Sequence, residues 1–229
     1  MTSSLNLGSP APPIKVQNWL RGDPLSNFQL GKIYVVEFFS TTCGYCAPEL
    51  SDLAKLHKKF IDTGVEFTGI AASEEAATAD DARAQVDASI TKSLPNTNIR
   101  MGFDHSGEMD EDWLKASLSF HVPKTFVVDR DGSIAFIGDL VMLQDVLPKV
   151  IDGTWRARAE AKNAEEERIA EGETMLRRLF HDRVSAAIEI KNWKAALSAI
   201  EEGINLNPDS IFLRRNFIGT SSAQSKPGP

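Results

Sequence analysis

The sequence predicts an α/β fold with a mixed central sheet flanked by helices, followed by an all-α extension at the C-terminus. Apolar, β-branched runs alternate with amphipathic segments through the first part of the chain, and the last two runs are joined by a tight turn. After Trp155 the sequence becomes charged and Ala-rich, which indicates a long helix mostly in water. At 229 residues, of which 42% are hydrophobic, the chain is long enough for one sizeable core plus an appendage.

The first elements are expected to build the centre of the sheet. Residues 5–32 contain repeated Pro and Gly, which predicts an extended lead-in with short edge pairings. Residues 32–40, "KIYVVEFFS", are apolar without polar alternation, so we expect a buried central strand with Glu37 inside it. Residues 48–60 follow as an amphipathic helix whose leucines recur near helical spacing.

The next elements continue the alternation of strands and helices. Residues 64–72 predict a second strand, and residues 98–103 a short further one. Between them we expect a crossover helix over residues 80–94, with Ser73 as its cap. Residues 108–120 predict another helix, whose acidic first turn suits the helix dipole.

A hairpin and a helix are expected to close the first domain. The "DRDG" turn at residues 129–132 joins apolar runs at residues 125–128 and 134–137, which is a strong hairpin signal. Residues 142–152 then predict a terminal helix. We therefore expect the first domain to span residues 1–152.

The extension, residues 153–218, predicts a spacer helix followed by a helix pair. The pair resembles one tetratricopeptide unit at Phe180, Ala187, Trp193, Ala196, Ile200, Gly203 and Pro208. A single unit cannot bury its own apolar face, so we expect it to pack on the spacer helix, on the first domain or on another copy or partner. Residues 219–229 are of low complexity and are expected to be disordered.

Composition argues against two classes of partner. The net charge of −7, without a basic cluster, opposes binding to nucleic acid. No stretch approaches the roughly 18 apolar residues that a membrane-spanning helix needs. The N-terminal residues lack a basic start and an apolar signal core, so the chain as written is expected to be cytoplasmic, or periplasmic if a leader has been removed.

The two cysteines, Cys43 and Cys46, lie in "FFSTTCGYCAPEL" directly after the central strand. A closed zinc site needs about four ligands, and none of the four histidines has suitable spacing. A structural disulfide that closes so short a loop would add little stability. The pair lies where a helix N-terminus would lower a thiol pKa, so the pattern favours redox chemistry.

Three separated segments together resemble the thioredoxin fold, specifically the TlpA/ResA-like thiol:disulfide oxidoreductases. They are the "GKIYVVEFFS" strand, the cysteine pair and "HVPKTFVVDRDGS", and the resemblance covers residues 7–152. It implies that Cys43 attacks a disulfide, that Cys46 resolves the mixed disulfide, and that Val122 and Pro123 form a cis peptide facing the pair. The implied partners are protein thiols or disulfides and a reductant or oxidant, with no cofactor and no metal.

The sequence departs from this family pattern around the cysteines. The family usually has Pro between its cysteines, whereas Pro48 here falls two residues after Cys46. Pro48 would kink a helix that begins at Cys43 but is tolerated in the first turn of a later one. Thr42 replaces a common Trp, so the aromatic shield is absent or comes from Tyr45. We expect Thr42, Tyr45 and Val122 to contact the substrate.

Two carboxylates are candidate proton acceptors for the buried thiol. Glu37 occupies the place of a buried Asp in thioredoxins, and Glu49 matches a Glu of the ResA-like branch. Apolar neighbours would raise the pKa of Glu37, whereas the helix dipole would favour ionised Glu49 and make it the poorer base. The pattern alone leaves open that Glu37 is an edge carboxylate reaching solvent.

Two other functions remain as alternatives. The first is a peroxiredoxin-like thiol peroxidase, whose reactive cysteine follows a Pro-x-x-x-Thr-x-x-Cys pattern. Neither cysteine fits, because Ser40 and Val36 precede Cys43 at these positions, and Cys43 and Phe39 precede Cys46. The second is a Sco-like copper-binding chaperone, in which His121 joins the two thiols as a ligand.

Overall fold

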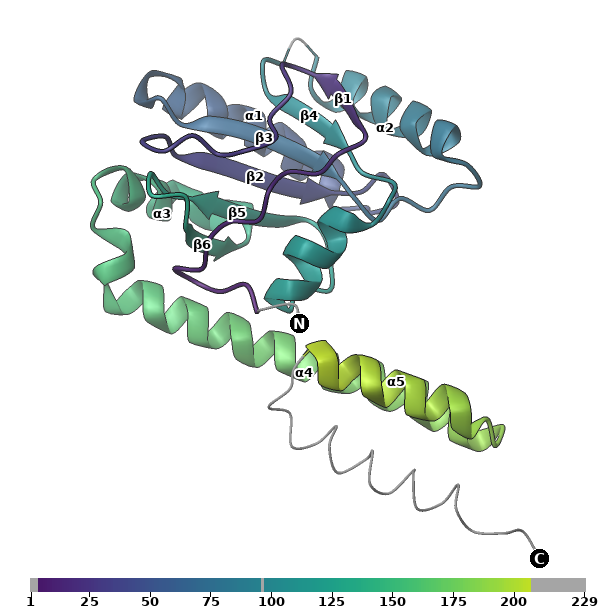
Figure 1. The fold of residues 1–229 in the computed structure, drawn as a ribbon. Coiled ribbons are helices and arrows are strands. Elements are labelled where there is room, and N and C mark those ends of the chain that lie inside the picture. The colour runs from purple at the N-terminus through teal and green to yellow at the C-terminus, as the bar shows by residue number, and fades with distance from the viewer. Residues whose placement is uncertain (1–3, 96, 207–229) are drawn as a thin grey trace, which may run out of the picture.

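The computed structural model describes residues 4–95 and 97–206, and within them six strands form one mixed sheet (Figure 1). The strands are β1 (Asn18–Arg21), β2 (Tyr34–Phe39), β3 (Glu66–Ala71), β4 (Arg100–Phe103), β5 (Lys124–Val128) and β6 (Ile134–Gly138). Their order is β1-β4-β3-β2-β5-β6. The mixed sheet confirms the predicted fold class.

Strand β2 is the buried centre that its apolar sequence predicts. All six of its residues are buried, Glu37 included, because β3 pairs with it in parallel on one side and β5 in antiparallel on the other. In the β2–β5 register Glu37 lies opposite Thr125, and Phe38 lies opposite Lys124. The lead-in contributes β1, which pairs with β4 at the edge, as the Pro- and Gly-rich sequence predicts.

Three helices cover one face of the sheet: α1 (Cys46–Phe60), α2 (Ala79–Ser93) and α3 (Leu143–Ile151). Their apolar side chains join those of Val35, Phe39 and Val127 in one core. The lead-in and residues 108–117 cover the other face, where Trp113 is fully buried and packs edge-on against Phe126 (Figure 1). The sheet is therefore covered on both faces, as expected.

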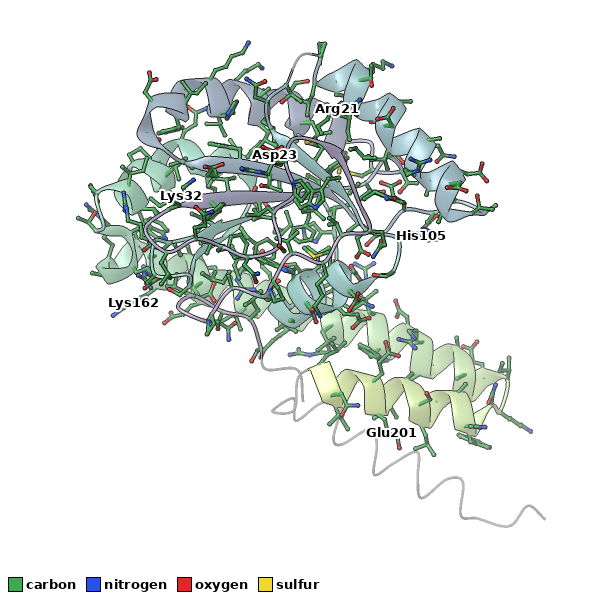
Figure 2. The ribbon with its side chains drawn as sticks, turned by 45° about the horizontal axis from the view of Figure 1, so that its top comes forward. Arg21, Asp23, Lys32, His105, Lys162 and Glu201 are labelled. Atoms are coloured by element: carbon green, nitrogen blue, oxygen red, sulfur yellow. The ribbon has the colours of Figure 1, made fainter. Side chains whose placement is uncertain are left out.

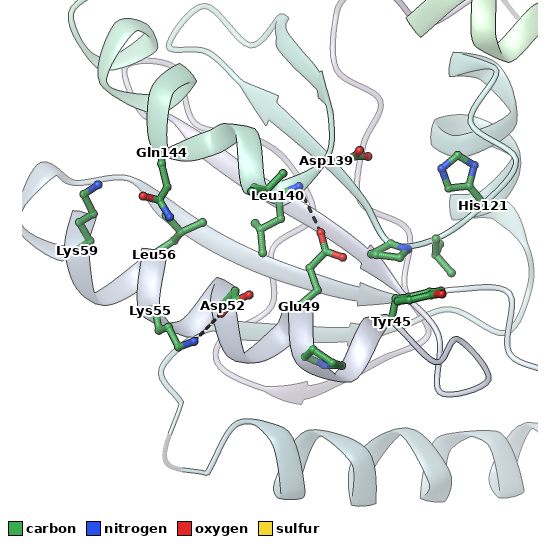
Figure 3. A pocket seen from close by; sticks show the side chains of 14 residues that line it. Tyr45, Glu49, Asp52, Lys55, Leu56, Lys59, His121, Asp139, Leu140 and Gln144 are labelled. Carbon is green, nitrogen blue, oxygen red and sulfur yellow. Dashed lines mark hydrogen bonds and ion pairs between the residues drawn. The ribbon is translucent and has the colours of Figure 1, made fainter.

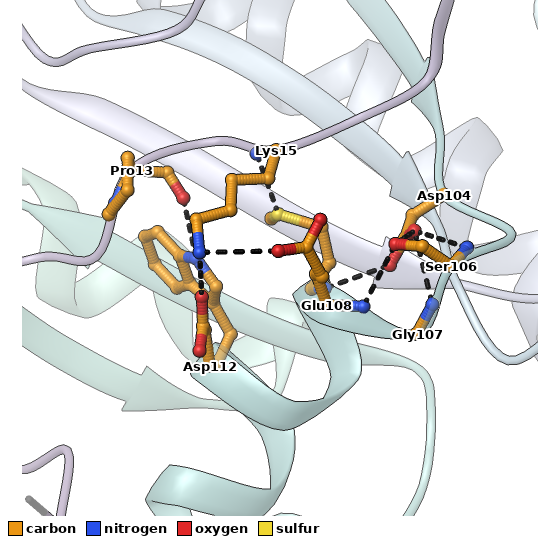
Figure 4. A network of polar contacts seen from close by, with 9 residues as sticks. Pro13, Lys15, Asp104, Ser106, Gly107, Glu108 and Asp112 are labelled. Atoms are coloured by element: carbon orange, nitrogen blue, oxygen red, sulfur yellow. Dashed lines mark hydrogen bonds and ion pairs between the residues drawn. The ribbon is translucent and has the colours of Figure 1, made fainter. Parts of the chain in front are cut away.

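The helix predicted at residues 108–120 is shorter and irregular. It contains a π-helical turn, Asp110–Leu114, and a 3₁₀ turn, Lys115–Ser117, and it ends where Leu118 adopts a left-handed backbone with φ of 57°. Its start is fixed by Asp104, whose carboxylate accepts a hydrogen bond from the Met109 backbone N–H at 2.8 Å (Figure 4).

Lys15 of the lead-in ties the same helix to the N-terminal segment. Its Nζ lies 3.0 Å from Asp112 Oδ2 and 3.5 Å from Glu108 Oε1 (Figure 4). Both ion pairs are solvent-accessible, so water and salt screen them and they contribute little to stability. The acidic first turn predicted from the sequence thus has a basic partner from the lead-in.

Two helix starts settle questions that the sequence raises. Ser73 does not cap the crossover helix, because Thr78 does: its Oγ1 accepts a hydrogen bond from the Asp81 N–H at 3.1 Å. Ser73 instead adopts a left-handed backbone with φ of 59°. Helix α1 begins at Cys46, so Pro48 lies in its first turn. Backbone N–H groups of the first turn have no acceptor within the helix, so proline costs the helix no hydrogen bond there.

The extension consists of two long helices, α4 (Ala159–Glu189) and α5 (Trp193–Leu206). The predicted spacer and the first helix of the pair are one continuous helix of 31 residues, about 46 Å long. The two helices bury Leu176, Phe180, Val184, Ala187, Ala196, Ala199 and Ile200 against each other. The likeness to a tetratricopeptide unit is not confirmed, and Pro208 and residues 219–229 lie outside the described residues.

The first half of the extension packs on the sheet domain, and the second half projects from it with α5 (Figure 1). Trp155 is 2% exposed and donates a hydrogen bond from Nε1 to the Ala135 carbonyl at 2.8 Å. Arg168 of α4 donates to the Ser117 carbonyl. Lys162 and Glu201 lie on the solvent faces of α4 and α5 (Figure 2). In the described ranges, no helix is both long and apolar enough to cross a bilayer.

Candidate active site

The two cysteines lie where β2 leads into α1, and they differ sharply in exposure. Cys46 is the first residue of α1 and is only 2% exposed, whereas Cys43 in the preceding turn is partly exposed. The turn is tight, because the Cys43 N–H donates to the Ser40 carbonyl and the Cys46 N–H donates to the Cys43 carbonyl, each at 3.3 Å. Both cysteines are free thiols in this structure.

The Val122–Pro123 peptide bond is cis, as the resemblance implies, and its loop faces the exposed thiol. The Cys43 thiol donates to the Val122 carbonyl oxygen at an Sγ to O distance of 3.4 Å. This contact brings together segments that are 79 residues apart in the sequence. Cys43 is thus held between the start of α1 and a backbone carbonyl of the loop before β5.

The buried thiol resists ionisation. Burial, followed by the interaction with the Cys43 thiol, raises the pKa of Cys46 well above the ordinary value of a cysteine. The nearby Glu37 carboxylate adds a smaller effect in the same direction. Cys46 therefore needs a base before it can act as a nucleophile, because only the thiolate attacks.

Glu37 is buried in the central strand β2, close enough to Cys46 to act on it, rather than reaching solvent at a sheet edge. Its exposed fraction is 0%, and this burial raises its pKa to about 8. The Thr125 hydroxyl donates to Glu37 Oε2 across the β2–β5 pair, which partly offsets the effect of burial. Glu37 Oε1 has no hydrogen-bond partner among the described residues, so one oxygen is available to accept a proton.

Glu49 is held by the loop after β6. Its Oε1 accepts a hydrogen bond from the Leu140 N–H at 3.3 Å (Figure 3). The sequence predicts that the helix dipole favours ionised Glu49, and this expectation is wrong in direction. Partial burial raises the pKa of Glu49, and nearby Asp139 adds to this, because both penalise the charged form.

A pocket of about 740 Å³ opens at the start of α1 (Figure 3), and its lining includes Tyr45, which lies between the two cysteines in the sequence. Tyr45 and Pro48 of the α1 start, Val122 and Pro123 of the cis loop, and Val141 after β6 line its apolar part. Tyr45 and Val141 are 83% and 76% exposed, so two apolar side chains face solvent at its rim.

Thr42, the third predicted contact residue, lies outside this lining. It is exposed beside Cys43, and its hydroxyl forms a 2.9 Å hydrogen bond with the Ser40 hydroxyl. The structure thus gathers Tyr45 and Val122 at one pocket, with Thr42 on the turn next to it.

Lys124 and Asp139 belong to the same region, and the sequence analysis did not single them out. Lys124 follows Pro123 directly and is 8% exposed, and its Nζ lies 2.7 Å from Asp139 Oδ1. A lysine at the head of an otherwise apolar strand was the available signal, because a buried lysine is rare without a charged partner.

His121 lines the pocket, and burial lowers its pKa, which favours the neutral ring. Across the described part of the chain, no group of three or more His, Cys, Asp or Glu side chains is arranged to hold a metal ion. His121 therefore does not form a three-ligand copper site with the two thiols in this structure.

Comparison with known proteins identifies the family of this chain. Residues 7–137 match the model of the AhpC/TSA family. The chain belongs to the AhpC/TSA family. Over 217 residues, it is 89% identical to protein FixW of Rhizobium leguminosarum, an overlap that covers 95% of this chain and 98% of FixW.

Solved structures resemble the sheet domain. The thioredoxin domain of a thiol-disulfide oxidoreductase from Bacteroides vulgatus is 23% identical, with a TM-score of 0.50 over 65% of this chain and 99% of that one. A thioredoxin-like protein in its oxidised form is 16% identical, with a TM-score of 0.51 over 64% of this chain and 97% of that one. These identities are low, so the likenesses show the thioredoxin fold alone.

Proposed function

We propose that this protein is a thiol:disulfide oxidoreductase that exchanges a Cys43–Cys46 dithiol with disulfides of partner proteins. The observation that carries the proposal is the asymmetry of the pair: Cys43 is accessible beside the Val122 carbonyl, while Cys46 lies buried behind it at the start of α1. An accessible thiol followed by a sheltered one suits attack by the first and resolution by the second.

The reaction transfers two electrons. The Cys43 thiolate attacks one sulfur of the partner's disulfide, which forms a mixed disulfide and releases one partner thiolate. Cys46 then gives its proton to a base, and its sulfur attacks Cys43 Sγ. The Cys43–Cys46 disulfide forms, and the second partner thiolate leaves. A reductant restores the dithiol, and the opposite net direction requires an oxidant instead.

We propose Glu37 as the base for the second step. It is a buried carboxylate whose pKa of about 8 suits proton exchange near neutral pH, and its charge is felt at Cys46. Glu49 is the competing candidate, but its Oε1 already accepts from Leu140. Glu49 is therefore better placed to hold the loop at the pocket rim than to take a proton.

The pocket beside the pair supports a protein or peptide substrate. Exposed Tyr45 and Val141 line it together with the Val122–Pro123 loop, which suits an apolar side chain next to the partner's cysteine. The Val122–Pro123 loop is partly buried and adjoins Cys43, so an extended partner backbone can lie along it while its sulfur meets Cys43 Sγ. We propose that Tyr45 and Val122 contact the substrate from this pocket, and that Thr42, which lies outside the lining, contacts it from the turn beside Cys43.

Trapping the mixed disulfide tests the proposal. The Cys46→Ala variant should accumulate partner proteins linked through Cys43 in a cell extract, and dithiothreitol should release them. The Cys43→Ala variant is the matched control and should trap none. Equal recovery with the two variants, or no thiol-sensitive adduct with either, would refute a role in disulfide exchange.

A further inference from the structure

The cis loop, residues 117–123, connects the helical extension to the redox site. Near its end, the Val122 carbonyl accepts a hydrogen bond from the Cys43 thiol at 3.4 Å. At its start, the Ser117 carbonyl accepts a hydrogen bond from the guanidinium group of Arg168 in α4. One short loop therefore contacts both the exposed thiol and the extension.

The Arg168 side chain is held in place by groups outside the cis loop. Its Nε lies 2.8 Å from Glu165 Oε2, and the two side chains are only 10% and 13% exposed. Glu165 Oε1 also accepts a hydrogen bond from the Leu7 N–H at 2.8 Å, and Arg168 Nη2 donates to Asn6 Oδ1 at 3.1 Å. A planar guanidinium with several fixed acceptors has one orientation, so Arg168 can hold the start of the loop.

The middle of the cis loop packs on the extension as well. Leu118 and Phe120 pack against the apolar cluster that α4 and α5 share. Gly172 permits this approach, because a Cβ there would lie 2.6 Å from the Leu118 carbonyl oxygen. Among the described residues, neither Phe120 nor His121 makes a hydrogen bond, so packing places this part of the loop.

The sheet domain holds the loop at other points. The Ser119 N–H donates to the Leu114 carbonyl at 2.8 Å, and Val122 packs against the cores on both faces of the sheet. These contacts fix the first turn of the loop and its entry into β5. The stretch between them depends on α4 and α5.

We propose that the helical extension is part of the substrate site, because α4 sets the position of the Val122–Pro123 peptide against Cys43. Arg168 is a positioning residue that acts through the Ser117 carbonyl, and it does not line the pocket. The inference rests on the proposed function, in which the partner's backbone lies along this loop. Attack by Cys43 on a docked disulfide then depends on the extension. Resolution by Cys46 occurs within the turn at the start of α1 and does not.

Arg168→Met tests this dependence because it removes the contact to Ser117. Attack on a disulfide-bonded peptide should slow by roughly tenfold at pH 7, since a misplacement of about 1 Å in a docking group can cost as much as 10²-fold. Resolution by Cys46 should change by less than about twofold. A peptide that carries a fluorescent group on each cysteine-bearing half separates the two steps in a stopped-flow instrument, because one half leaves at each step.

Two further variants separate positioning from general damage. Arg183→Met makes the same change in the same helix, where Arg183 pairs with Glu202 at 2.8 Å away from the loop, and should leave both rates unchanged. Glu165→Gln/Arg168→Gln leaves no unpaired buried carboxylate, so it tests the lost contact without an uncompensated charge. Its attack rate should fall as it does in Arg168→Met. Attack at the wild-type rate in the double variant, or equal slowing of both steps, would overturn the inference.

Amide NMR spectra of the reduced protein distinguish this inference from the proposed function. If the wild type exchanges no disulfides, the proposed function fails in the rate measurement. The amide signals of Val122 and Cys43 still report whether the loop moves relative to the thiol. We expect both signals to shift in the Glu165→Gln/Arg168→Gln variant and to stay in place in Arg183→Met. Signals of Val122 and Cys43 that match the wild type in the double variant would show that α4 does not position the loop.

Discussion

At the scale of single residues, Glu37 is the group on which the proposed chemistry depends most. Glu37→Gln keeps the size of the side chain and its place opposite Thr125 but removes the proton acceptor. Resolution of a mixed disulfide on Cys43 should slow by roughly 10² near pH 7, the contribution typical of a positioned acid or base. The loss should shrink at high pH, where Cys46 ionises without help. Stopped-flow release of a fluorescent thiol across pH measures this.

Glu49→Gln is the control for that experiment. Glu49 Oε1 accepts a hydrogen bond from the Leu140 N–H at 3.3 Å, and the side-chain oxygen of Gln can accept the same bond. We therefore expect Glu49→Gln to slow resolution less than Glu37→Gln does. A Glu49 variant slower than the Glu37 variant at pH 7 would move the base from β2 to α1.

Glu37 should also make stability depend on pH. Its pKa is about 8 in the folded protein and near the ordinary glutamate value of 4.5 when the chain is unfolded. Below pH 4.5 the carboxyl is protonated in both the folded and the unfolded protein, so it does not lower stability there. The free energy of unfolding falls as pH rises from about 4.5 toward 8, because the unfolded state ionises first. The slope from this one group is at most about 1.4 kcal/mol per pH unit. Urea unfolding should show a flatter profile for Glu37→Gln, and an identical slope would contradict the assignment.

The sequence predicts only some of these residue properties. The burial of Glu37 follows from its apolar neighbours in a central strand. The raised pKa of Glu49 does not, because partial burial of its carboxyl outweighs the lowering effect of the hydrogen bond from the Leu140 N–H. The partner of Lys124 is set by how β6 ends beside β5, which no local pattern reports.

At the scale of elements, the strands and the hairpin follow from local pattern, whereas helix limits depend on packing. The "DRDG" turn and its flanking runs give β5 and β6 as predicted. The start of α2 at residue 80 was predicted within one residue, but its cap was wrong because either Ser73 or Thr78 suits a cap, and only tertiary structure places Ser73 in a left-handed turn. The continuity of α4 was missed because its charged and apolar stretches differ in composition although the backbone does not break.

Gly172 of α4 makes a testable element-scale contact. A Cβ added there would lie 2.6 Å from the Leu118 carbonyl oxygen, closer than atoms pack, and a backbone atom cannot easily yield. Gly172→Ala should therefore loosen α4 from the sheet domain, at a cost of about 1–3 kcal/mol despite the better helix propensity of Ala. Hydrogen exchange should show lost protection in α4 around this residue. Ala170→Ser, an exposed neighbour, is the control, and equal protection in both variants would rule out the contact.

At the scale of the whole molecule, the sheet domain and the helical extension meet near the redox site. Glu171 of α4 is close enough to act on His121, which lines the pocket beside Cys43. The described parts of α4 and α5 bury their shared apolar cluster within one chain. Self-association through these helices remains a prediction that sedimentation of the full chain can test. The fold and the cysteine pair were predictable because their signals are local, while this juxtaposition arises only on folding.

The central claim is that the Cys43–Cys46 pair reacts with disulfides, and competing oxidants test it most directly. The reduced protein is mixed in a stopped-flow instrument with a disulfide-bonded peptide or with hydrogen peroxide, and formation of the Cys43–Cys46 disulfide is followed by mass spectrometry. We predict that the peptide disulfide oxidises the pair faster at equal concentration and that Cys46→Ala stops at the mixed disulfide. Faster oxidation by peroxide, with the peptide leaving both thiols reduced, would contradict the account.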